Sequence, residues 1–429
     1  MPIRLEARAP DFAARFTAFV NARRESDQDV SQVVRDVIAR VREAGDAALA
    51  EYSQRFDRID VEKLGLRISA QEIKAARAHV SAEVVQALEL AAERIRAFHL
   101  QQRPTDSDTT DASGVRAGWR WRALDAAGLY VPGGLASYPS SVLMNAIPAK
   151  VAGVARLAMV TPTPDGRLNP LVLVAADIAG VDEVYRVGGA QAIAALAYGT
   201  KTIASVDKIV GPGNAYVAEA KRQLFGVVGI DMVAGPSEIL VVADAQSDPR
   251  WLAIDLLSQA EHDATAQAIL ITDSADLAAR TAEEVEIWLG QLATAKTARV
   301  AWENYGALIV VENLADAVPL IDRLAPEHLA LSVENPDALL DKVRHAGSVF
   351  LGRHTPEAIG DYVGGPNHVL PTGRRARFSS GLSVADFMKR TTFLACSDQG
   401  LAAIGPAAVA LAEAEGLEAH AQSVRVRLS

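Results

Sequence analysis

Between residues 156 and 226, short apolar runs alternate with segments of helical periodicity, and this alternation constrains the fold more than any other feature. Runs such as "LAMVTPT" and "EVYRVGG" have the length and apolar content of buried strands, whereas "NPLVLVAADIAG" is typical of a helix. Strands are expected at residues 157–163, 183–189 and 207–213, and helices at 169–180, 190–199 and 215–226. Strands and helices that alternate in this way form a parallel sheet with helices on both faces.

A second series of the same kind follows. Its strands are expected at residues 238–244, 266–272, 307–313, 329–333 and 348–352, with helices between them. The first hundred residues are mostly helical, "TDSDTTDASG" (105–114) is a polar turn cluster, and the chain turns helical again after Gly381. We therefore predict an α/β protein with two parallel sheets that face a cleft.

Composition narrows the classes of partner and compartment. The chain has 429 residues, half of them apolar and 22% charged, which is typical of a soluble globular protein. Its net charge of −10 argues against nucleic acid or an anionic membrane as a partner. The N-terminus has no apolar stretch of the secretory kind, and the single cysteine, Cys396, fits a reducing compartment. We expect a cytoplasmic protein.

The stretch "LLSQAEHDAT" (256–265) places polar side chains at the end of an apolar helix. Gln259 and His262 are three residues apart, so they point from the same helix face. A solvated helix end and a metal site are both consistent with this pattern, and the residues alone do not decide between them.

Two further stretches are candidates for chemistry. In "APEHLALS" (325–332), Glu327 and His328 stand side by side where a loop enters a strand, and an acid beside an imidazole there suits general-base catalysis. A solvated strand start is the alternative. The stretch "IGDYVGGPNHVLPTG" (359–373) has no regular period and contains Asp361, a hard oxygen donor. Long irregular loops inside an α/β unit are often functional.

Glycine turns between strand and helix indicate an anion site. In "VGPGNAYV" (210–217) a strand, a tight turn and a helix follow one another, and the free N–H groups of the helix start suit a dinucleotide phosphate. The stretch "VGGAQA" (187–192) repeats this order. Neither is G-x-G-x-x-G, and no acidic residue stands at the usual distance to bind a ribose.

Other polar residues carry little signal by themselves. "AGPSE" (234–238) and "EAEGLEAH" (413–420) look like ordinary loop and helix-end sequences. Cys396 could attack an aldehyde, but a single cysteine in an apolar run is more often a small core residue.

Taken together, these stretches resemble the histidinol dehydrogenase family of NAD-dependent zinc enzymes, which end histidine biosynthesis. The matching segments run in order from Gly128 to Lys389, and they include "GLYVPGGLASYPSSVLMNAIPAKVAGV", "KIVGPGNAYVAEAKRQ", "DMVAGPSEILVVAD", "LLSQAEHD" and "GPNHVLPTGRRARFSSGLSVADFMK". The terminal "EGLEAH" also fits. The resemblance implies two incomplete Rossmann-like domains plus small helical pieces, in agreement with the two α/β series.

The resemblance also implies roles for individual residues. One zinc ion per subunit would be held by Gln259, His262, Asp361 and His420, the last from the other subunit of a homodimer. Glu327 and His328 match the catalytic base pair. Ser237 and Glu415 match substrate contacts, alongside the metal positions and His328. The nucleotide contacts match Tyr130, Gln191 and Asn214.

The implied reaction is the oxidation of L-histidinol to L-histidinal and then to L-histidine, with two NAD⁺ used in turn. Zinc would bind the imidazole and amine of the substrate and orient it. His328 would take the alcohol proton, and Glu327 would activate water for attack on the aldehyde. Cys396 lies outside the matching motifs.

Three rival functions differ in their chemistry. A relative of the family could oxidise another small polar alcohol, such as a sulfonated diol; Ser237, His368 and Glu415 favour histidinol. A zinc hydrolase would use Glu327 without a dinucleotide. A non-catalytic binding protein is hard to reconcile with a complete acid–base pair and four metal positions.

The predicted division of the chain follows the family pattern. Residues 1–25 form an N-terminal helical segment, and residues 26–127 with 238–380 form a domain that carries most metal and catalytic residues. Residues 128–237 form a Rossmann-like domain with the nucleotide contacts. Residues 381–429 form a helical segment that crosses to the partner subunit.

Overall fold

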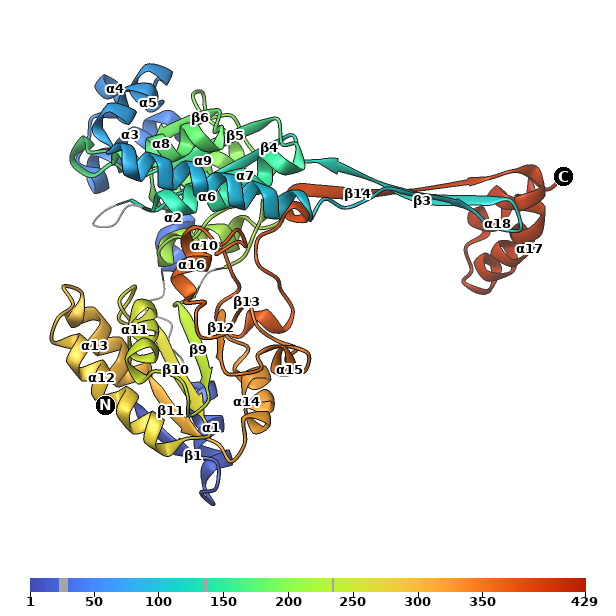
Figure 1. The fold of residues 1–429 in the computed structure, drawn as a ribbon. Coiled ribbons are helices and arrows are strands. Elements are labelled where there is room, and N and C mark those ends of the chain that lie inside the picture. Colours follow the sequence, from blue (N-terminus) through green and yellow to red (C-terminus); the bar gives the residue numbers. More distant parts are fainter. Residues whose placement is uncertain (23–29, 134–137, 234) are drawn as a thin grey trace.

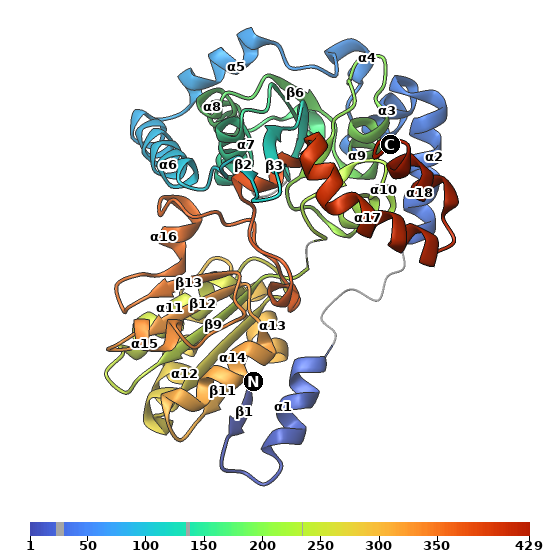
Figure 2. The ribbon, with the colours of Figure 1, turned by 90° about the vertical axis from the view of Figure 1, so that its right-hand side faces the viewer.

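Two parallel sheets form separate α/β units in the computed structural model, which describes residues 1–22, 30–133, 138–233 and 235–429 (Figure 1). Figure 2 shows one unit above the other, with helix α16 (Glu357–Tyr362) between them. A long antiparallel arm projects from the upper unit in Figure 1. The predicted α/β class with two parallel sheets is confirmed.

The first unit is built on a five-stranded sheet of order β6-β5-β4-β7-β8. Its strands are β4 (Ala126–Tyr130), β5 (Arg156–Thr161), β6 (Glu183–Arg186), β7 (Lys208–Val210) and β8 (Gly229–Ile230). All paired neighbours run parallel. The helices of this unit are α2 (Ser31–Ala44), α3 (Asp46–Tyr52), α4 (Val61–Leu64), α5 (Ala70–Ala76), α6 (Ala82–Leu100), α7 (Pro139–Ala152), α8 (Pro170–Ala179), α9 (Gly189–Tyr198) and α10 (Ala215–Leu224).

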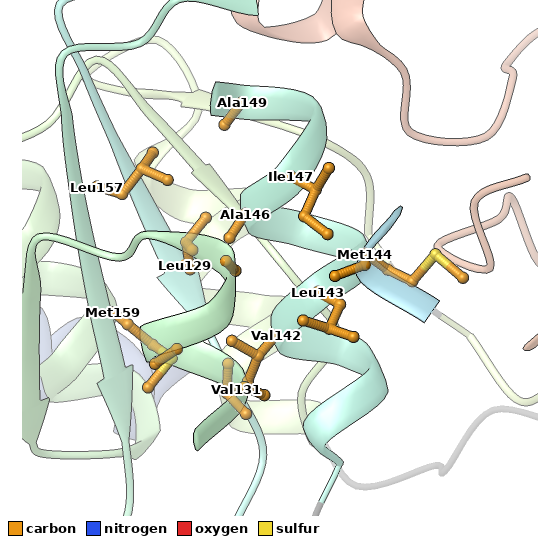
Figure 3. Packing of buried hydrophobic residues seen from close by; sticks show 14 of the residues in the cluster. Leu129, Val131, Val142, Leu143, Met144, Ala146, Ile147, Ala149, Leu157 and Met159 are labelled. Atoms are coloured by element: carbon orange, nitrogen blue, oxygen red, sulfur yellow. The ribbon is translucent and has the colours of Figure 1, made fainter. Parts of the chain in front are cut away.

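Alternate residues of each strand enter different cores, because successive side chains point to opposite faces of a sheet. Leu129 packs with α6, α7 and α8, whereas Tyr130 packs with α2, α3, α9 and α10. Figure 3 shows Leu129 and Val131 beside apolar side chains of α7 such as Val142. Burial on both faces explains why these strands read as nearly continuous apolar runs.

The second unit has a six-stranded parallel sheet of order β1-β11-β10-β9-β12-β13. Its strands are β1 (Ile3–Glu6), β9 (Glu238–Ala243), β10 (Gln267–Thr272), β11 (Ala307–Val310), β12 (His328–Ser332) and β13 (Ser348–Leu351). Its helices are α1 (Phe12–Asn21), α11 (Pro249–Ala260), α12 (Ala275–Leu289), α13 (Ala295–Tyr305), α14 (Ala317–Leu324), α15 (Asp337–Leu340) and α16. Helices α11, α12 and α13 share a core with one face of the sheet, and α1, α14 and α15 with the other.

The arm consists of three antiparallel strands and two terminal helices. The strands are β2 (Ser107–Thr110), β3 (Val115–Ala123) and β14 (Met388–Cys396), in the order β14-β3-β2. Helices α17 (Asp398–Ala414) and α18 (Glu418–Arg425) lie at the far end of the arm, beside the C-terminus (Figure 1). The arm therefore carries its helices away from both α/β units.

Six strands lie outside the segments predicted as strands: β1, β2, β3, β4, β8 and β14. Strand β14 lies where the sequence indicated helix, β2 lies inside the predicted turn cluster, and β1 lies inside the predicted N-terminal helical segment. Strand β14 is largely exposed and has no alternating apolar pattern, so pairing with β3 rather than burial stabilises it. Strand β1 pairs with β11, about 300 residues away in sequence, which no local pattern can indicate.

The helices of residues 31–100 pack differently from the predicted grouping with residues 238–380. Apolar residues of α2 and α3 share a core with α9 and α10, and those of α6 with α7 and α8, so these helices cover the five-stranded sheet. The reason is that their apolar stripes complement those of α7 to α10, and this pairing cannot be seen in the order of the sequence. The predicted boundary at residues 25–26 lies outside the described residues.

Candidate active site

Glu327 and His328 lie at the amino-terminal edge of the six-stranded sheet. Strand β12 begins at His328, and the neighbouring strand β9 begins at Glu238. Glu327 Oε2 accepts a hydrogen bond from the main-chain N–H of Glu238 at 2.9 Å, and Glu238 Oε2 accepts one from the N–H of Glu327 at 3.3 Å. This reciprocal pair holds both acids at the loop-to-strand corner where the sequence placed Glu327 and His328.

The tautomer of His328 follows from one contact. Its Nδ1 lies 2.9 Å from the main-chain oxygen of Glu238, and a carbonyl can only accept, so Nδ1 carries the proton. The other nitrogen, Nε2, is buried and has no hydrogen-bond partner among the described residues. Burial lowers the pKa of His328 below its usual value, against the opposing effect of Asp361. The ring is therefore a neutral base with an unused lone pair.

Helix α16 directs two acids at this ring. Asp361 Oδ1 lies 3.8 Å from His328 Nε2, and Glu357 Oε1 lies 3.6 Å from His328 Nδ1. Ligand atoms of all three residues lie within 4.8 Å of one another. Burial, and then the neighbouring Asp361 and Glu327 carboxylates, raise the pKa of Glu357. Asp361 was predicted in an irregular loop, but it occupies the last turn of a short helix.

Gln259 reaches the same cluster from α11, where it is buried in the last turn. We assign its amide with the nitrogen toward Glu357, because the reverse orientation sets the amide oxygen against carboxylate acceptors; the nitrogen then donates to Oε1 at 2.5 Å and to Oε2 at 3.0 Å. His262 lies two residues beyond the helix end, in an exposed turn, and it is close enough to influence the pKa values of His328 and His368. The predicted common helix for Gln259 and His262 thus ends before His262.

The loop that follows α16, residues 363–368, holds the helix between the two units through hydrogen bonds. His368 Nδ1 lies 3.0 Å from the main-chain oxygen of Asp361. Asn367 Nδ2 donates to the main-chain oxygen of Met144 in α7 at 2.6 Å, and Arg94 of α6 donates to the oxygen of Val363 at 2.5 Å. The first unit therefore helps to position Asp361.

His420 and Glu415 are not brought to this cluster within one chain. Both are exposed, and α18, which contains His420, lies at the tip of the arm away from α11 and α16 (Figure 1). Ser237 is half-buried and directly precedes Glu238, and its main-chain oxygen accepts from Gln267 N at 2.9 Å.

The predicted nucleotide contacts lie at the carboxyl ends of the strands of the other sheet. Tyr130 ends β4, and its hydroxyl accepts from the N–H of Gly189 at 3.1 Å; burial raises the pKa of Tyr130 to about 12. Gln191 is buried in the first turn of α9. Asn214 caps α10, where its side chain accepts from two main-chain N–H groups. This edge is the usual ligand position in open α/β sheets.

The Gly-Pro-Gly turn before Asn214 is held by a buried ion pair. Asp231 Oδ2 accepts from Gly211 N at 2.8 Å, and Lys221 Nζ donates to Gly211 O at 2.9 Å and to Asp231 Oδ1. Gly211 has φ of +109°, and a Cβ there would lie 2.2 Å from the main-chain oxygen of Tyr130. Only glycine allows this close approach.

Comparison with known proteins identifies the family. The sequence model described as histidinol dehydrogenase matches residues 20–428. Histidinol dehydrogenases of Zymomonas mobilis subsp. mobilis and Rhodospirillum rubrum are each 63% identical, over 100% of this chain and 100% and 99% of theirs. The chain belongs to the histidinol dehydrogenase family.

The fold of a histidinol dehydrogenase agrees with this assignment. The crystal structure of the Elizabethkingia anophelis enzyme is 38% identical and superposes with a TM-score of 0.95, over 99% of this chain and 97% of that one. Family membership makes the protein an oxidoreductase of histidine biosynthesis, as predicted, and the alternative with a different polar alcohol is not favoured. In the described part of the chain, no helix has the length and apolar character needed to cross a membrane.

Two acids of this site, Glu238 and Glu357, are not among the site residues predicted from the sequence. Glu238 is the first residue of a fully buried strand. A charged residue in a buried strand needs polar partners, so its position in the sequence could have indicated a site. Glu357 precedes Asp361 by four residues, so the two share a helix face. That spacing becomes visible only once the segment is known to be helical.

Proposed function

We propose that the chain oxidises L-histidinol to L-histidine by way of L-histidinal, with Glu327 and His328 as its catalytic residues. The observation that carries the proposal is the state of His328: a buried, neutral ring whose Nδ1 is held by Glu238 and whose Nε2 has no partner among the described residues. A general base needs a nitrogen of this kind, whose lone pair is available to take a proton from the reacting group.

The residues of the cluster fit a zinc ion. Gln259, His262 and Asp361 offer an amide oxygen, an imidazole and a carboxylate, which zinc accepts, and the described chain brings them toward His328. We assign the fourth position to His420, from a second copy of the chain. When bound, zinc supplies a positive charge that can hold the imidazole and amine of histidinol and orient them.

The chain's own groups divide the proton transfers. In the first oxidation His328 Nε2 takes the hydroxyl proton of the alcohol, while a hydride leaves for NAD⁺ and the aldehyde forms. In the second, Glu327 takes a proton from water as the water oxygen adds to the aldehyde carbon, and the protonated His328 returns its proton to the aldehyde oxygen. The resulting gem-diol loses a proton and a hydride to a second NAD⁺, and the carboxylic acid forms. Histidinol, water and two NAD⁺ thus give histidine as its carboxylic acid, two NADH and two protons.

We place NAD at the carboxyl edge of the five-stranded sheet, against Tyr130, Gln191 and Asn214. The start of α10 supports this position, because main-chain N–H groups at a helix start attract phosphate. Catalytic groups at the amino edge of one sheet and nucleotide contacts at the carboxyl edge of the other suit a substrate held between the two units.

We infer a homodimer in which the arm of each subunit completes the site of its partner. The support is geometric: His420 and Glu415 are exposed at the arm tip, remote from the site of their own chain. Exposed apolar residues of the same tip, such as Ile404, Leu411 and Leu417, suit contact with a second subunit. The single exposed Cys396 and the biosynthetic role favour the cytoplasm.

The test of this function is the absorbance of NADH when L-histidinol and NAD⁺ are added to the zinc-loaded protein. We expect two NADH per histidinol and little NADH with a sulfonated diol. The variant His262→Asn should contain less zinc and lose both oxidations. NADH formation only with the diol would refute the substrate, and full zinc occupancy in His262→Asn would refute the metal assignment.

A further inference from the structure

Glu357 has no role in the proton transfers described above, yet it lies at the centre of the site. It is buried, with 3% of its surface exposed, and it stands one helical turn before Asp361 on α16. With the Gln259 amide assigned so that its nitrogen faces the acid, this nitrogen lies 2.5 and 3.0 Å from the two carboxylate oxygens of Glu357. An acid of this kind needs partners, and the Gln259 amide supplies two contacts to it.

The contact determines how the Gln259 amide is turned. An ionised Glu357 only accepts hydrogen bonds, so in that state the amide nitrogen of Gln259 faces Glu357 and the amide oxygen faces away from it. Without this acceptor, the side chain could rotate by half a turn and exchange the two ends. The end that faces the site would then carry N–H groups, which repel a cation and cannot bind it.

We propose that Glu357 is a positioning residue for the metal centre: by holding the amide nitrogen of Gln259, it presents the amide oxygen as a zinc ligand. The inference rests on the proposed assignment of Gln259 as a ligand. Helix α16 would then serve the metal twice, directly through Asp361 and indirectly through Glu357. Groups that orient metal ligands in this way typically change metal affinity about 10- to 100-fold when they are removed.

Two conservative variants separate the hydrogen bond from the charge. Glu357→Gln loses the charge but keeps a carbonyl oxygen that can accept from Gln259. Glu357→Asp keeps the charge but shortens the side chain and withdraws the acceptor from the amide. The measurement is the zinc affinity of the apo full-length protein, by competition with a chromophoric chelator.

We expect Glu357→Asp to bind zinc about 10- to 100-fold more weakly, and Glu357→Gln to stay close to the unmodified protein. Glu357→Ala, which removes the acceptor and the charge, should match Glu357→Asp and replaces it if that variant does not fold. Glu312→Gln is the control, because it makes the same acid-to-amide change at an exposed carboxylate that pairs with Arg8, away from the cluster. Its zinc affinity should not change.

If Glu357→Gln instead binds zinc weakly and Glu357→Asp binds it normally, the inference is overturned. Glu357 would then be a charge partner or a direct ligand. Gln259→Ala separates this failure from a failure of the proposed function. If Gln259→Ala binds zinc normally, the ligand assignment itself is wrong. If Gln259→Ala binds zinc weakly while Glu357→Asp and Glu357→Ala bind it normally, only the positioning role is wrong. In the double variant Gln259→Ala/Glu357→Asp, affinity should fall no further than in Gln259→Ala alone.

Discussion

The main-chain oxygen of Glu238 lies 2.9 Å from Nδ1 of His328, and this contact decides which nitrogen of the ring is available as a base. The two residues begin neighbouring parallel strands, where His328 pairs with Ile239. The sheet itself therefore sets the tautomer, with no need for a side-chain carboxylate.

The first prediction concerns the base. Asparagine at position 328 can keep the donor to Glu238 O but has no atom where Nε2 stands. His328→Asn should therefore lower the rate of histidinol oxidation by about 10²–10⁴-fold, the usual contribution of a general base. Stopped-flow formation of NADH with saturating substrates measures this. A rate within tenfold of the unmodified enzyme would assign the base elsewhere.

The second prediction concerns Glu327. Glu327 is assigned to the step in which water adds to the aldehyde. Glu327→Gln should therefore oxidise histidinol to the aldehyde better than it oxidises histidinal. The rate of histidinal oxidation should fall by about 10²–10⁴-fold. Each substrate is assayed separately for NADH. Equal losses on both would show that Glu327 and His328 act together in each step.

The third prediction tests the shared site. In a mixed dimer of His420→Ala and His262→Ala chains, one site carries both lesions and the other carries neither. Activity should return to at most about half of the unmodified level per mixed dimer when subunits exchange. The assay is NADH formation after mixing, with each variant alone as control. No recovery, in spite of exchange shown by tagged subunits, would place His420 in the site of its own chain.

The fourth prediction concerns Cys396. Its thiol is exposed near the end of β14, on the arm, and none of the proposed steps uses it. Cys396→Ala should retain most activity on histidinol and histidinal. A loss of several orders of magnitude with zinc still bound would instead indicate a covalent thiohemiacetal.

The fifth prediction concerns pH and stability. His99 is fully buried, and burial lowers its pKa below the value of about 6.5 in the unfolded chain. The unfolded state therefore binds more protons between the two pKa values. The contribution to stability is complete above pH about 6.5 and is lost as the pH falls below it, by at most about 1.4 kcal/mol per pH unit for one proton.

Urea unfolding at a series of pH values tests this, with His99→Gln as the comparison. The variant should lose less free energy of unfolding on acidification than the unmodified protein. Some loss should remain, because burial also lowers the pKa values of His328 and His368. Parallel pH dependence in the two proteins would exclude a neutral His99 as a source of acid sensitivity.

Much of the fold follows from local sequence. Most strands of the two parallel sheets were predictable, because burial on two faces demands nearly unbroken apolar runs, such as the five residues that follow Glu238 in β9. The turn and helix start at Asn214 were predictable because glycine, proline and an asparagine cap act within a few residues. The resemblance to the family supplied the remaining site residues, which no period or spacing singles out.

The tertiary structure alone decided what distant residues do to one another. It showed that β14 pairs with β3 in an exposed arm, that Glu238 sets the tautomer of His328, and that Glu357 faces Gln259. The physical reason is the distance in sequence between the residues that interact. Helix and strand patterns arise from side chains a few residues apart, so the sequence by itself determined the two series of strands and helices. Sheet order, buried acid–amide contacts and an arm that leaves its own domain depend on pairings between residues far apart in the sequence, and these exist only once the chain has folded.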